Sequence, residues 1–258
     1  PPTECTIRYQ GVDITRRTRT DAKAAALRIQ MIFQDPMSSM NPRKRIQDIV
    51  AEAPVVHGLI RRAEARAFVE DILTRVGLDP SVRDRYPHQF SGGQRQRIVI
   101  ARALAVEPRF LICDESVAAL DVSIQAQVLN LFMRLRRELG LTYLFISHDL
   151  GVVEHISDRV VILYLGRVVE EAPTEALFTE PRHPYTQALL AEVPRLSTGK
   201  RSFQPIKGEI PSPLAPPPGC HFHTRCPHAG PRCSREIQRL RRDGARRVAR
   251  HLEDGGVA

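Results

Sequence analysis

The chain has 258 residues, enough for one large domain or for one domain with an appendage. Its hydrophobic content of 42% and charged content of 26% are ordinary for a globular protein. No run approaches the roughly 18 apolar residues of a membrane-spanning helix, and no charged-then-apolar leader opens the sequence. We therefore expect a cytosolic protein without a secretion signal, bound to a membrane only through partners.

Charge and cysteine content narrow the class of protein further. The net charge of +9 would suit nucleic acid or an anionic membrane as a partner. Many of the arginines lie between Arg232 and Arg250, however, and basic blocks are commonly solvent-exposed tails, the interpretation that we favour. The five cysteines are an odd number, which argues against a disulfide framework.

The first part of the chain is predicted to hold two short strands and then a helical region. The strands are expected at residues 6–9 and 30–33. Residues 43–78 are mostly helical, because their apolar residues recur near helical periodicity and Gly77 stands where a C-terminal cap is expected. A polar loop over residues 79–89 follows.

From Ser91 onward, helices alternate with short apolar strands. Residues 91–105 are predicted as a helix, and Ser123 is the expected N-cap of a second helix. This alternation implies an α/β fold with a buried parallel sheet. The other expected elements are strands at 110–113, 142–146, 159–165 and 167–170, the last two turning at Gly166, and a short helix at 149–156.

The composition changes after about Glu171, where prolines become frequent at 211–213 and 216–218. Proline cannot donate to a β-ladder, so these stretches are excluded from a central sheet. We expect an α/β domain over residues 1–170, a helical subdomain within it at about 43–105, and an extended Pro- and Cys-rich appendage over residues 171–258.

The most specific stretch is Phe90-Ser91-Gly92-Gly93-Gln94-Arg95-Gln96-Arg97. Its serine and glycines open a helix, where backbone N–H groups attract phosphate and glycines let the backbone approach closely. A lone S-G-G would favour a simple helix cap. The full run, followed by Phe110-Leu111-Ile112-Cys113-Asp114-Glu115, resembles the signature and Walker B motifs of ATP-binding-cassette (ABC) ATPases.

Asp114 and Glu115 end the buried strand. Adjacent carboxylates at the end of a strand point in different directions, so the two side chains can have different roles. Asp114 would hold Mg²⁺, usually through water, because that ion takes few carboxylates and keeps several waters. Glu115 would polarise the attacking water. The alternative, a pair of solvated loop carboxylates, is disfavoured by the apolar strand before them.

The resemblance implies further site residues. His148, at the end of the next strand, would contact the γ-phosphate and hold the water in line. Gln34 resembles the Q-loop glutamine, which senses Mg²⁺ and water and whose loop touches the transmembrane partner. Residues 119–121 resemble the D-loop that crosses the dimer interface, which assigns Asp121 to the nucleotide site. Ala118 replaces the usual serine, which weakens one polar contact.

Motifs along nearly the whole chain resemble the oligopeptide/dipeptide importer branch of ABC ATPases. The branch implies a P-loop NTPase-type fold with ATP and Mg²⁺ as cofactors. It implies a second ABC ATPase subunit, transmembrane permease subunits and, indirectly, an extracytoplasmic substrate-binding protein, at the cytoplasmic face of the membrane. The cargo would be peptides or, in relatives, nickel, and no nucleic acid is implied. The motifs are Ile32-Phe33-Gln34-Asp35-Pro36, Ser39-Met40-Asn41-Pro42-Arg43, Tyr86-Pro87-His88-Gln89-Phe90, Tyr164-Leu165-Gly166-Arg167, His183-Pro184-Tyr185-Thr186 and Gly208-Glu209-Ile210-Pro211-Ser212-Pro213.

Cys220, Cys226 and Cys233 resemble the cysteine tail of the same branch. Four thiolates could hold an iron–sulfur cluster or zinc. The branch commonly has a later cysteine where this chain has Arg250, so a fourth ligand would have to be a histidine, and reduced packed cysteines are favoured over a metal site. The candidate histidines are His221, His223, His228 and His251.

The 258 residues contain no G-x-x-x-x-G-K-[ST] phosphate loop. Gly199-Lys200 is the only Gly-Lys pair, and Arg201 follows it. The segment 1–3 resembles the part of the family that comes just after the phosphate-loop helix. We therefore expect an N-terminally truncated ATPase, inactive alone, with uncovered strand edges and apolar faces that lower its stability.

Three functions remain under consideration. The first is an ATP-hydrolysing importer subunit in truncated form, and the second is a non-hydrolytic partner that supplies only the signature in trans. The third is a DNA-repair or chromosome-associated ABC ATPase, which the basic charge allows. That class carries long insertions between the motifs, and the span from Gln34 to Ser91 leaves no room for one, so we disfavour it.

Overall fold

The computed structural model describes residues 6–15, 25–192 and 208–250. The chain divides into two compact units, residues 1–148 and 149–258, and each is described by itself. None of the helices within those described ranges is long and apolar enough to cross a membrane. The domain boundary after residue 170 stays a prediction. The features noted at residues 1–3, Gly199-Lys200 and His251 lie outside the described residues.

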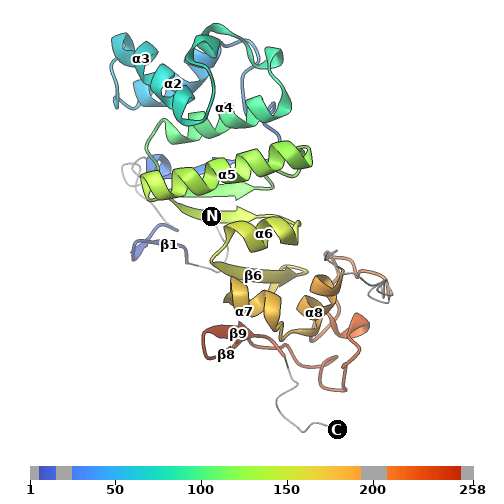
Figure 1. Ribbon diagram of the computed structural model, residues 1–258. Helices are drawn as coiled ribbons and strands as arrows, with labels where there is room; N and C mark the ends of the chain where they lie inside the picture. Colours follow the sequence, from blue (N-terminus) through green and yellow to red (C-terminus); the bar gives the residue numbers. More distant parts are fainter. Residues whose placement is uncertain (1–5, 16–24, 193–207, 251–258) are drawn as a thin grey trace. The chain divides into compact units, whose positions relative to one another are not determined.

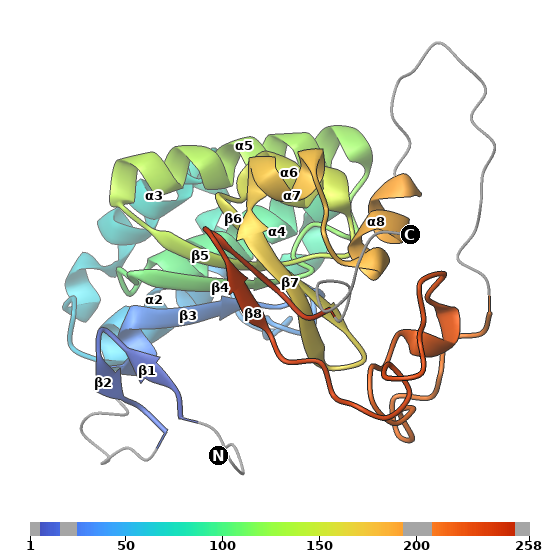
Figure 2. The same cartoon turned by 90° about the horizontal axis from the view of Figure 1, so that it is seen from below.

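A parallel sheet in the order β3-β4-β5 forms the centre of the first unit (Figure 2). The register pairs Ile32 with Cys113 and Asp114 with Ile146, so the carboxyl ends of all three strands meet at one edge. The predicted α/β fold with a parallel sheet is confirmed. The strands are β3, Ile29–Ile32, β4, Phe110–Asp114, and β5, Thr142–Ile146. A separate hairpin joins β1, Arg8–Tyr9, to β2, Val12–Asp13.

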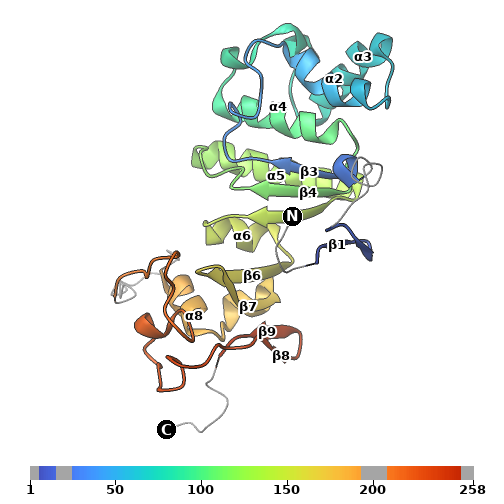
Figure 3. The ribbon, with the colours of Figure 1, turned by 180° about the vertical axis from the view of Figure 1, so that it is seen from behind.

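Helix α5, Val122–Leu139, covers one face of this sheet (Figure 1, Figure 3). Its Phe132 is fully buried and meets the rings of Tyr143 and Phe145 at centroid distances of 5.6 and 5.9 Å. The Tyr143 hydroxyl donates to the Phe132 carbonyl at 2.9 Å. The edge strand β5 is therefore held to the helix by ring packing and one side-chain bond.

The prediction that Ser123 caps α5 is wrong. The Asp121 carbonyl already accepts the Gln125 N–H at 2.8 Å, so the first helical bond starts at Asp121 and Ser123 lies inside the first turn. Asp121 is the N-cap residue by position, although its side chain makes no capping bond.

The helical subdomain contains α4 between the pair α2–α3 and helix α5 (Figure 1). The helical stretch predicted over residues 43–78 is two helices, which Gly58 separates with a φ of 71°. Gly77, with a φ of 74°, follows α3 as its expected cap position requires. The helices are α2, Ile46–Val56, α3, Ala65–Arg75, and α4, Gly92–Leu104, with 3-10 turns η1, Arg62–Glu64, η2, Pro80–Asp84, and η3, Pro87–Gln89.

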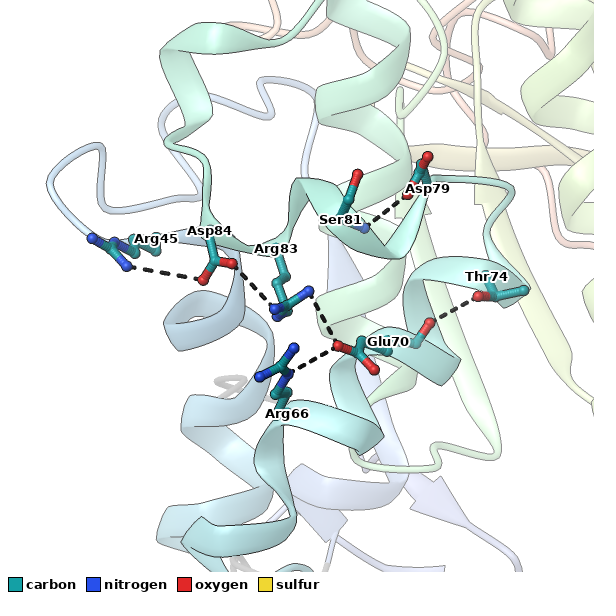
Figure 4. Close-up of polar contacts among 8 residues, drawn as sticks. All are labelled: Arg45, Arg66, Glu70, Thr74, Asp79, Ser81, Arg83 and Asp84. Atoms are coloured by element: carbon teal, nitrogen blue, oxygen red, sulfur yellow. Dashed lines mark hydrogen bonds and ion pairs between the residues drawn. The ribbon is translucent and has the colours of Figure 1, made fainter.

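A chain of ion pairs fastens η2 to these helices (Figure 4). The Arg83 side chain, 15% exposed, lies 3.1 Å from Glu70 Oε1 and 3.3 Å from Asp84 Oδ2. Arg66 reaches the same Glu70 oxygen at 3.2 Å, and Arg45 lies 3.9 Å from Asp84. Exposed pairs contribute little, so most of the stabilisation comes from the largely buried Arg83. The network holds the turn that leads toward the signature segment.

The second unit contains an antiparallel sheet in the order β6-β7-β9-β8. The predicted strand pair and its turn are confirmed, with Leu165 and Gly166 both at positive φ, as a tight two-residue hairpin requires. The strands are β6, Arg159–Tyr164, β7, Arg167–Pro173, β8, Arg241–Asp243, and β9, Arg246–Val248. The helical segments are α6, Leu150–Ile156, α7, Thr174–Thr179, α8, Pro184–Ala191, and η4, His223–Arg225.

The arginine-rich stretch is more ordered than a solvated tail. Part of it forms the β8–β9 hairpin, and β9 pairs with β7. Val248 is 4% exposed, while Arg247 reaches the Glu171 carboxylate at 3.5 Å. Alternation of the exposed Arg247 with the buried Val248 is the ordinary pattern of an antiparallel strand.

Strands β5 and β6 are each an edge strand of their own sheet among the described residues. On β5, Leu144 and Ile146 are 48% and 44% exposed. On β6, Val161 and Leu163 are 46% and 56% exposed. Edge strands with exposed apolar side chains, which the sequence led us to expect, favour association with other chains.

Two buried polar side chains fasten α8 to β7. The fully buried Glu170 carboxylate accepts the N–H groups of Arg182 and His183, each at 2.9 Å. His183, 1% exposed, caps α8 by accepting the Tyr185 N–H on Nδ1 at 3.0 Å. The His183-Pro184-Tyr185 segment is thus held by its backbone as well as by packing.

His183 should make the second unit sensitive to acid. Burial lowers its pKa to about 4, nearby Arg250 adds to this, and a hydrogen bond with Gln238 opposes it. An unfolded histidine has a pKa of about 6.5, so between about pH 6.5 and 4 only the unfolded state takes up the proton. We expect the free energy of unfolding to fall by about 3 kcal/mol over that range.

Urea unfolding at several pH values tests this expectation. The matched variant His183→Asn keeps a capping oxygen but has no group that titrates in this range. It should lose the part of the pH dependence that comes from this histidine. Equal pH dependence in both proteins would contradict the assignment.

Candidate nucleotide site

Four predicted residues follow or end the parallel strands of the first unit. Gln34 comes after β3, Asp114 and Glu115 close β4, and His148 comes after β5. His148 Nδ1 lies 3.1 Å from Glu115 Oε1, and the Glu115 N–H donates to the carbonyl of Ile146 at 2.9 Å. The carboxyl edge of an open α/β sheet is where such folds bind ligands. The structure therefore brings Glu115 and His148 into direct contact at that edge.

Glu115 has an unusual backbone conformation, with a φ of 45°. A non-glycine residue in the left-handed region costs about 1–3 kcal/mol, and such residues concentrate at functional sites. Its carbonyl accepts the Ala118 N–H at 3.0 Å, which fixes the following turn. The side chains of Glu115 and His148 are 30% and 71% exposed, so the pair is open to a ligand or a water molecule.

Asp114 fits one ligand position for Mg²⁺. The described part of the chain contains no group of three histidine, cysteine, aspartate or glutamate side chains that could hold a metal ion by itself. Mg²⁺ is typically bound through one or two carboxylates together with substrate phosphates and waters, so a single carboxylate at the strand end suits it.

The turn after Gln34 is fastened to the signature helix. The hydroxyls of Ser38 and Ser39 donate to the Asp35 carbonyl at 3.0 and 2.9 Å. Arg102 of α4 donates to the Ser39 carbonyl. Gln34 itself is exposed, so a braced turn presents it to solvent.

The signature residues form a second group at the start of α4. The Ser91 N–H donates to Gln94 Oε1 at 3.1 Å and the Gln94 N–H donates to Ser91 Oγ at 3.4 Å, a reciprocal capping box. A hydroxyl both accepts and donates, so Ser91 can accept from Gln94 and still give its proton to an anion. Ser91, Gly92 and Gln94 are exposed, which leaves this helix N-terminus open to phosphate.

Two arginines inside the signature brace it, and neither contact was predicted from the motif. Arg95 Nε donates to the Pro87 carbonyl at 3.0 Å. Arg97 Nη1 donates to the Val76 carbonyl at 2.8 Å. Backbone carbonyls are present at every residue, so only the fold shows which ones these guanidinium groups reach.

The signature glycines pack against the D-loop and α5. A Cβ atom at Gly92 would lie 3.7 Å from Leu120 Cδ2, an ordinary contact. A Cβ atom at Gly93 would lie 2.4 Å from Ile124 Cγ2, closer than side chains tolerate. Gly93 is therefore required by packing within this chain as well as by any approach of a phosphate.

Gly93→Ala should destabilise the first unit by about 1–3 kcal/mol, because the added methyl overpacks Ile124. Gly92→Ala is the matched control, and it should be neutral or slightly stabilising, since alanine is the better helix former. A double-mutant cycle with Ile124→Ala should recover most of the Gly93→Ala loss, measured by urea unfolding. Identical losses for the two glycines would refute the packing argument.

Comparisons with known proteins decide the family. The model of the family described as "ABC transporter" matches residues 1–118, and the one described as "Oligopeptide/dipeptide transporter, C-terminal region" matches residues 169–233. The oligopeptide transport ATP-binding protein AppF of Bacillus subtilis is 52% identical over 240 residues, covering 92% of this chain and 73% of that protein. The chain belongs to the ATP-binding subunits of oligopeptide/dipeptide ABC transporters.

A second relative and a solved ABC transporter structure also resemble this chain. The dipeptide transport ATP-binding protein DppF of Escherichia coli is 47% identical, covering 96% of this chain and 75% of that protein. The structure of CbiO1 from Clostridium perfringens, part of an ABC transporter complex, matches with a TM-score of 0.60 at 29% identity, covering 67% of each chain. The ABC ATPase fold predicted from the motifs is thereby confirmed.

Proposed function

We propose that this ABC subunit binds ATP with a second ATP-binding subunit and energises the import of peptides. The exposed, doubly capped N-terminus of α4 carries the proposal, because it presents the Ser91 hydroxyl and the first helical N–H groups to an anion. Ser91, Gly92, Gly93 and Gln94 would close over a nucleotide held by the partner subunit. Asp121, in the adjacent D-loop, would line the same interface.

The strand-end residues would serve the catalytic step at the chain's own half of the site where a phosphate loop holds the γ-phosphate, and the 258 residues contain no such loop. Asp114 would hold Mg²⁺, and Glu115 would polarise the attacking water. His148, in contact with Glu115, would keep that water in line, and Gln34 would sense Mg²⁺ and water. The contact between Glu115 and His148 supports this pairing of roles.

The partners follow from membership of the family. Transmembrane permease subunits would bind this subunit at the cytoplasmic face of the membrane, with an extracytoplasmic substrate-binding protein delivering the cargo. The cargo would be oligopeptides or dipeptides, as the names of the relatives suggest. The ATPase core would span residues 1–170 and the branch-specific extension residues 171–258.

Co-expression with a full-length ATP-binding relative tests the proposal. We expect a stable pair that hydrolyses ATP with Mg²⁺, and negligible turnover by the 258-residue chain alone, because its sequence contains no phosphate loop. Robust Mg²⁺-dependent turnover by this chain alone, abolished by Glu115→Gln, would contradict the second expectation. If the chain neither pairs with a full-length ATP-binding subunit nor contacts the nucleotide that this subunit holds, the proposal itself is contradicted.

A further inference from the structure

Two arginines from other helices close the C-terminus of α3. The carbonyls of residues 72–74 accept backbone N–H groups that follow them in the chain, at 2.9–3.2 Å. The next carbonyl, that of Arg75, accepts a bond from Arg134 Nη2 of α5 at 2.7 Å. The carbonyl of Val76 accepts a bond from Arg97 Nη1 of α4 at 2.8 Å. Positive donors at a helix C-terminus satisfy its free carbonyls and face the negative end of its dipole, so we call Arg97 and Arg134 the arginine clamp.

Arg97 is the more enclosed member of the arginine clamp. Burial lowers its pKa, and the positive charge of Arg134 lowers it further, which shows that the two guanidinium groups are near each other. Gly77 makes room for the Arg97 side chain, since a Cβ atom at Gly77 would lie 2.8 Å from Arg97 Nη1. The other terminal nitrogen, Nη2, donates to Gln127 Oε1 of α5 at 3.4 Å. One planar group thus joins α3, α4 and α5, which the single ammonium of a lysine could not do equally well.

The arginine clamp acts on the two helices that begin at the signature and at the D-loop. Ser91 is the N-cap of α4, the helix of Arg97, and Asp121 is the N-cap residue of α5, the helix of Arg134. The same two helices also touch nearer their N-termini, at the tight contact of Gly93. Contacts at two levels fix both the position and the rotation of α4 on α5, so the two N-termini keep one spacing.

We propose that Arg97 is a positioning residue for ATP hydrolysis, which together with Arg134 sets where Ser91 meets the nucleotide of the partner subunit. The inference rests on the proposed function, because the signature acts there on a nucleotide held in trans. Arg97 does not touch the nucleotide in this role and acts through Ser91 and the first helical N–H groups. Donors to a transition state depend on their placement, and an error of about 1 Å can cost about 100-fold in rate.

The pair formed with a full-length ATP-binding relative measures this role, with kcat given per assembled pair. Arg97→Gln should lower kcat by about 10–100-fold and change KM by less than about 2-fold, because only transition-state stabilisation is lost. Arg97→Lys keeps one charged donor for the Val76 carbonyl and should recover part of kcat. Arg137→Gln removes a positive charge from an exposed position on α5 and should leave kcat unchanged.

A double-mutant cycle separates positioning from general loss of structure. Since Arg97 acts through Ser91, Arg97→Gln should lower kcat by no more than about 3-fold in a Ser91→Ala background. Full kcat in the Arg97→Gln pair, or the same fold-loss in both backgrounds, would overturn the inference.

Amide exchange in the 258-residue chain reads the arginine clamp without ATP. The Arg95 N–H donates to the Ser91 carbonyl and the Leu78 N–H donates to the Leu73 carbonyl, each at 2.9 Å. Both amides should exchange faster in Arg97→Gln, while those of β4 should not, and unchanged exchange at both would refute the clamp. A wild-type pair that fails to hydrolyse ATP would contradict the proposed function instead, and amide exchange would then decide whether Arg97 holds α4 in place.

Discussion

With Ser91 replaced by arginine, an assembled pair is expected to hydrolyse ATP at the partner's phosphate loop at least about 100-fold more slowly. Ser91 caps α4 through the Gln94 N–H and stands exposed where a phosphate would approach. Arginine removes that cap and fills the approach with a long side chain. Removing a single preorganised donor from a charged transition state typically costs about 10²–10³ in kcat, and here the approach is blocked as well.

Controls separate a blocked site from a misfolded subunit. Ser91→Thr keeps a hydroxyl and a capping oxygen and should retain most of the activity. Ser81→Arg adds the same charge on the exposed turn η2 and should leave hydrolysis unchanged. The readout is phosphate release by co-purified pairs at saturating ATP. Full activity of the Ser91→Arg pair would show that this helix end does not touch the nucleotide.

The positions of Gln34, Asp114, Glu115 and His148 at the ends of the parallel strands were largely predictable from the sequence. Asp114 and His148 were placed correctly because parallel strands end at one edge of a sheet, so residues after successive strands become neighbours. The left-handed backbone of Glu115 was not predictable, since glutamate has no preference for it and only the surrounding turn enforces it. The braces from Arg95 and Arg97 were missed for a similar reason, because their partners are carbonyls remote from the motif.

The C-terminal segment shows where sequence patterns fail. Arg247 belongs to a basic block that would ordinarily be a solvated tail, yet it lies on β9, paired with β7 about 75 residues earlier. No residue pattern within the basic block predicts that pairing, because the pairing depends on the buried face that Val248 shares with β7. Glu170 illustrates the same limit, since its neighbour Glu171 is chemically identical, yet Glu170 is fully buried and the Glu171 side chain is 19% exposed.

Replacing Glu170 with alanine is expected to destabilise the second unit by about 3–5 kcal/mol. The carboxylate is fully buried and accepts the N–H groups of Arg182 and His183, so its removal leaves one buried and one partly buried donor unsatisfied and a cavity behind them. The amides of residues 182 and 183 should also exchange with solvent faster. Glu170→Gln should be intermediate, because its amide offers one oxygen where two donors converge.

The adjacent residue supplies the control. Glu171, 19% exposed, pairs with Arg159 at 2.7 Å and with Arg247 at 3.5 Å on the other face of β7. A partly solvated ion pair contributes little, so Glu171→Ala should cost about 1 kcal/mol or less. Urea unfolding and amide exchange distinguish the two variants, because only Glu170 contacts the start of α8. Equal midpoints for Glu170→Ala and Glu171→Ala would mean that packing around Phe222, and not the buried carboxylate, holds the His183-Pro184-Tyr185 segment in place.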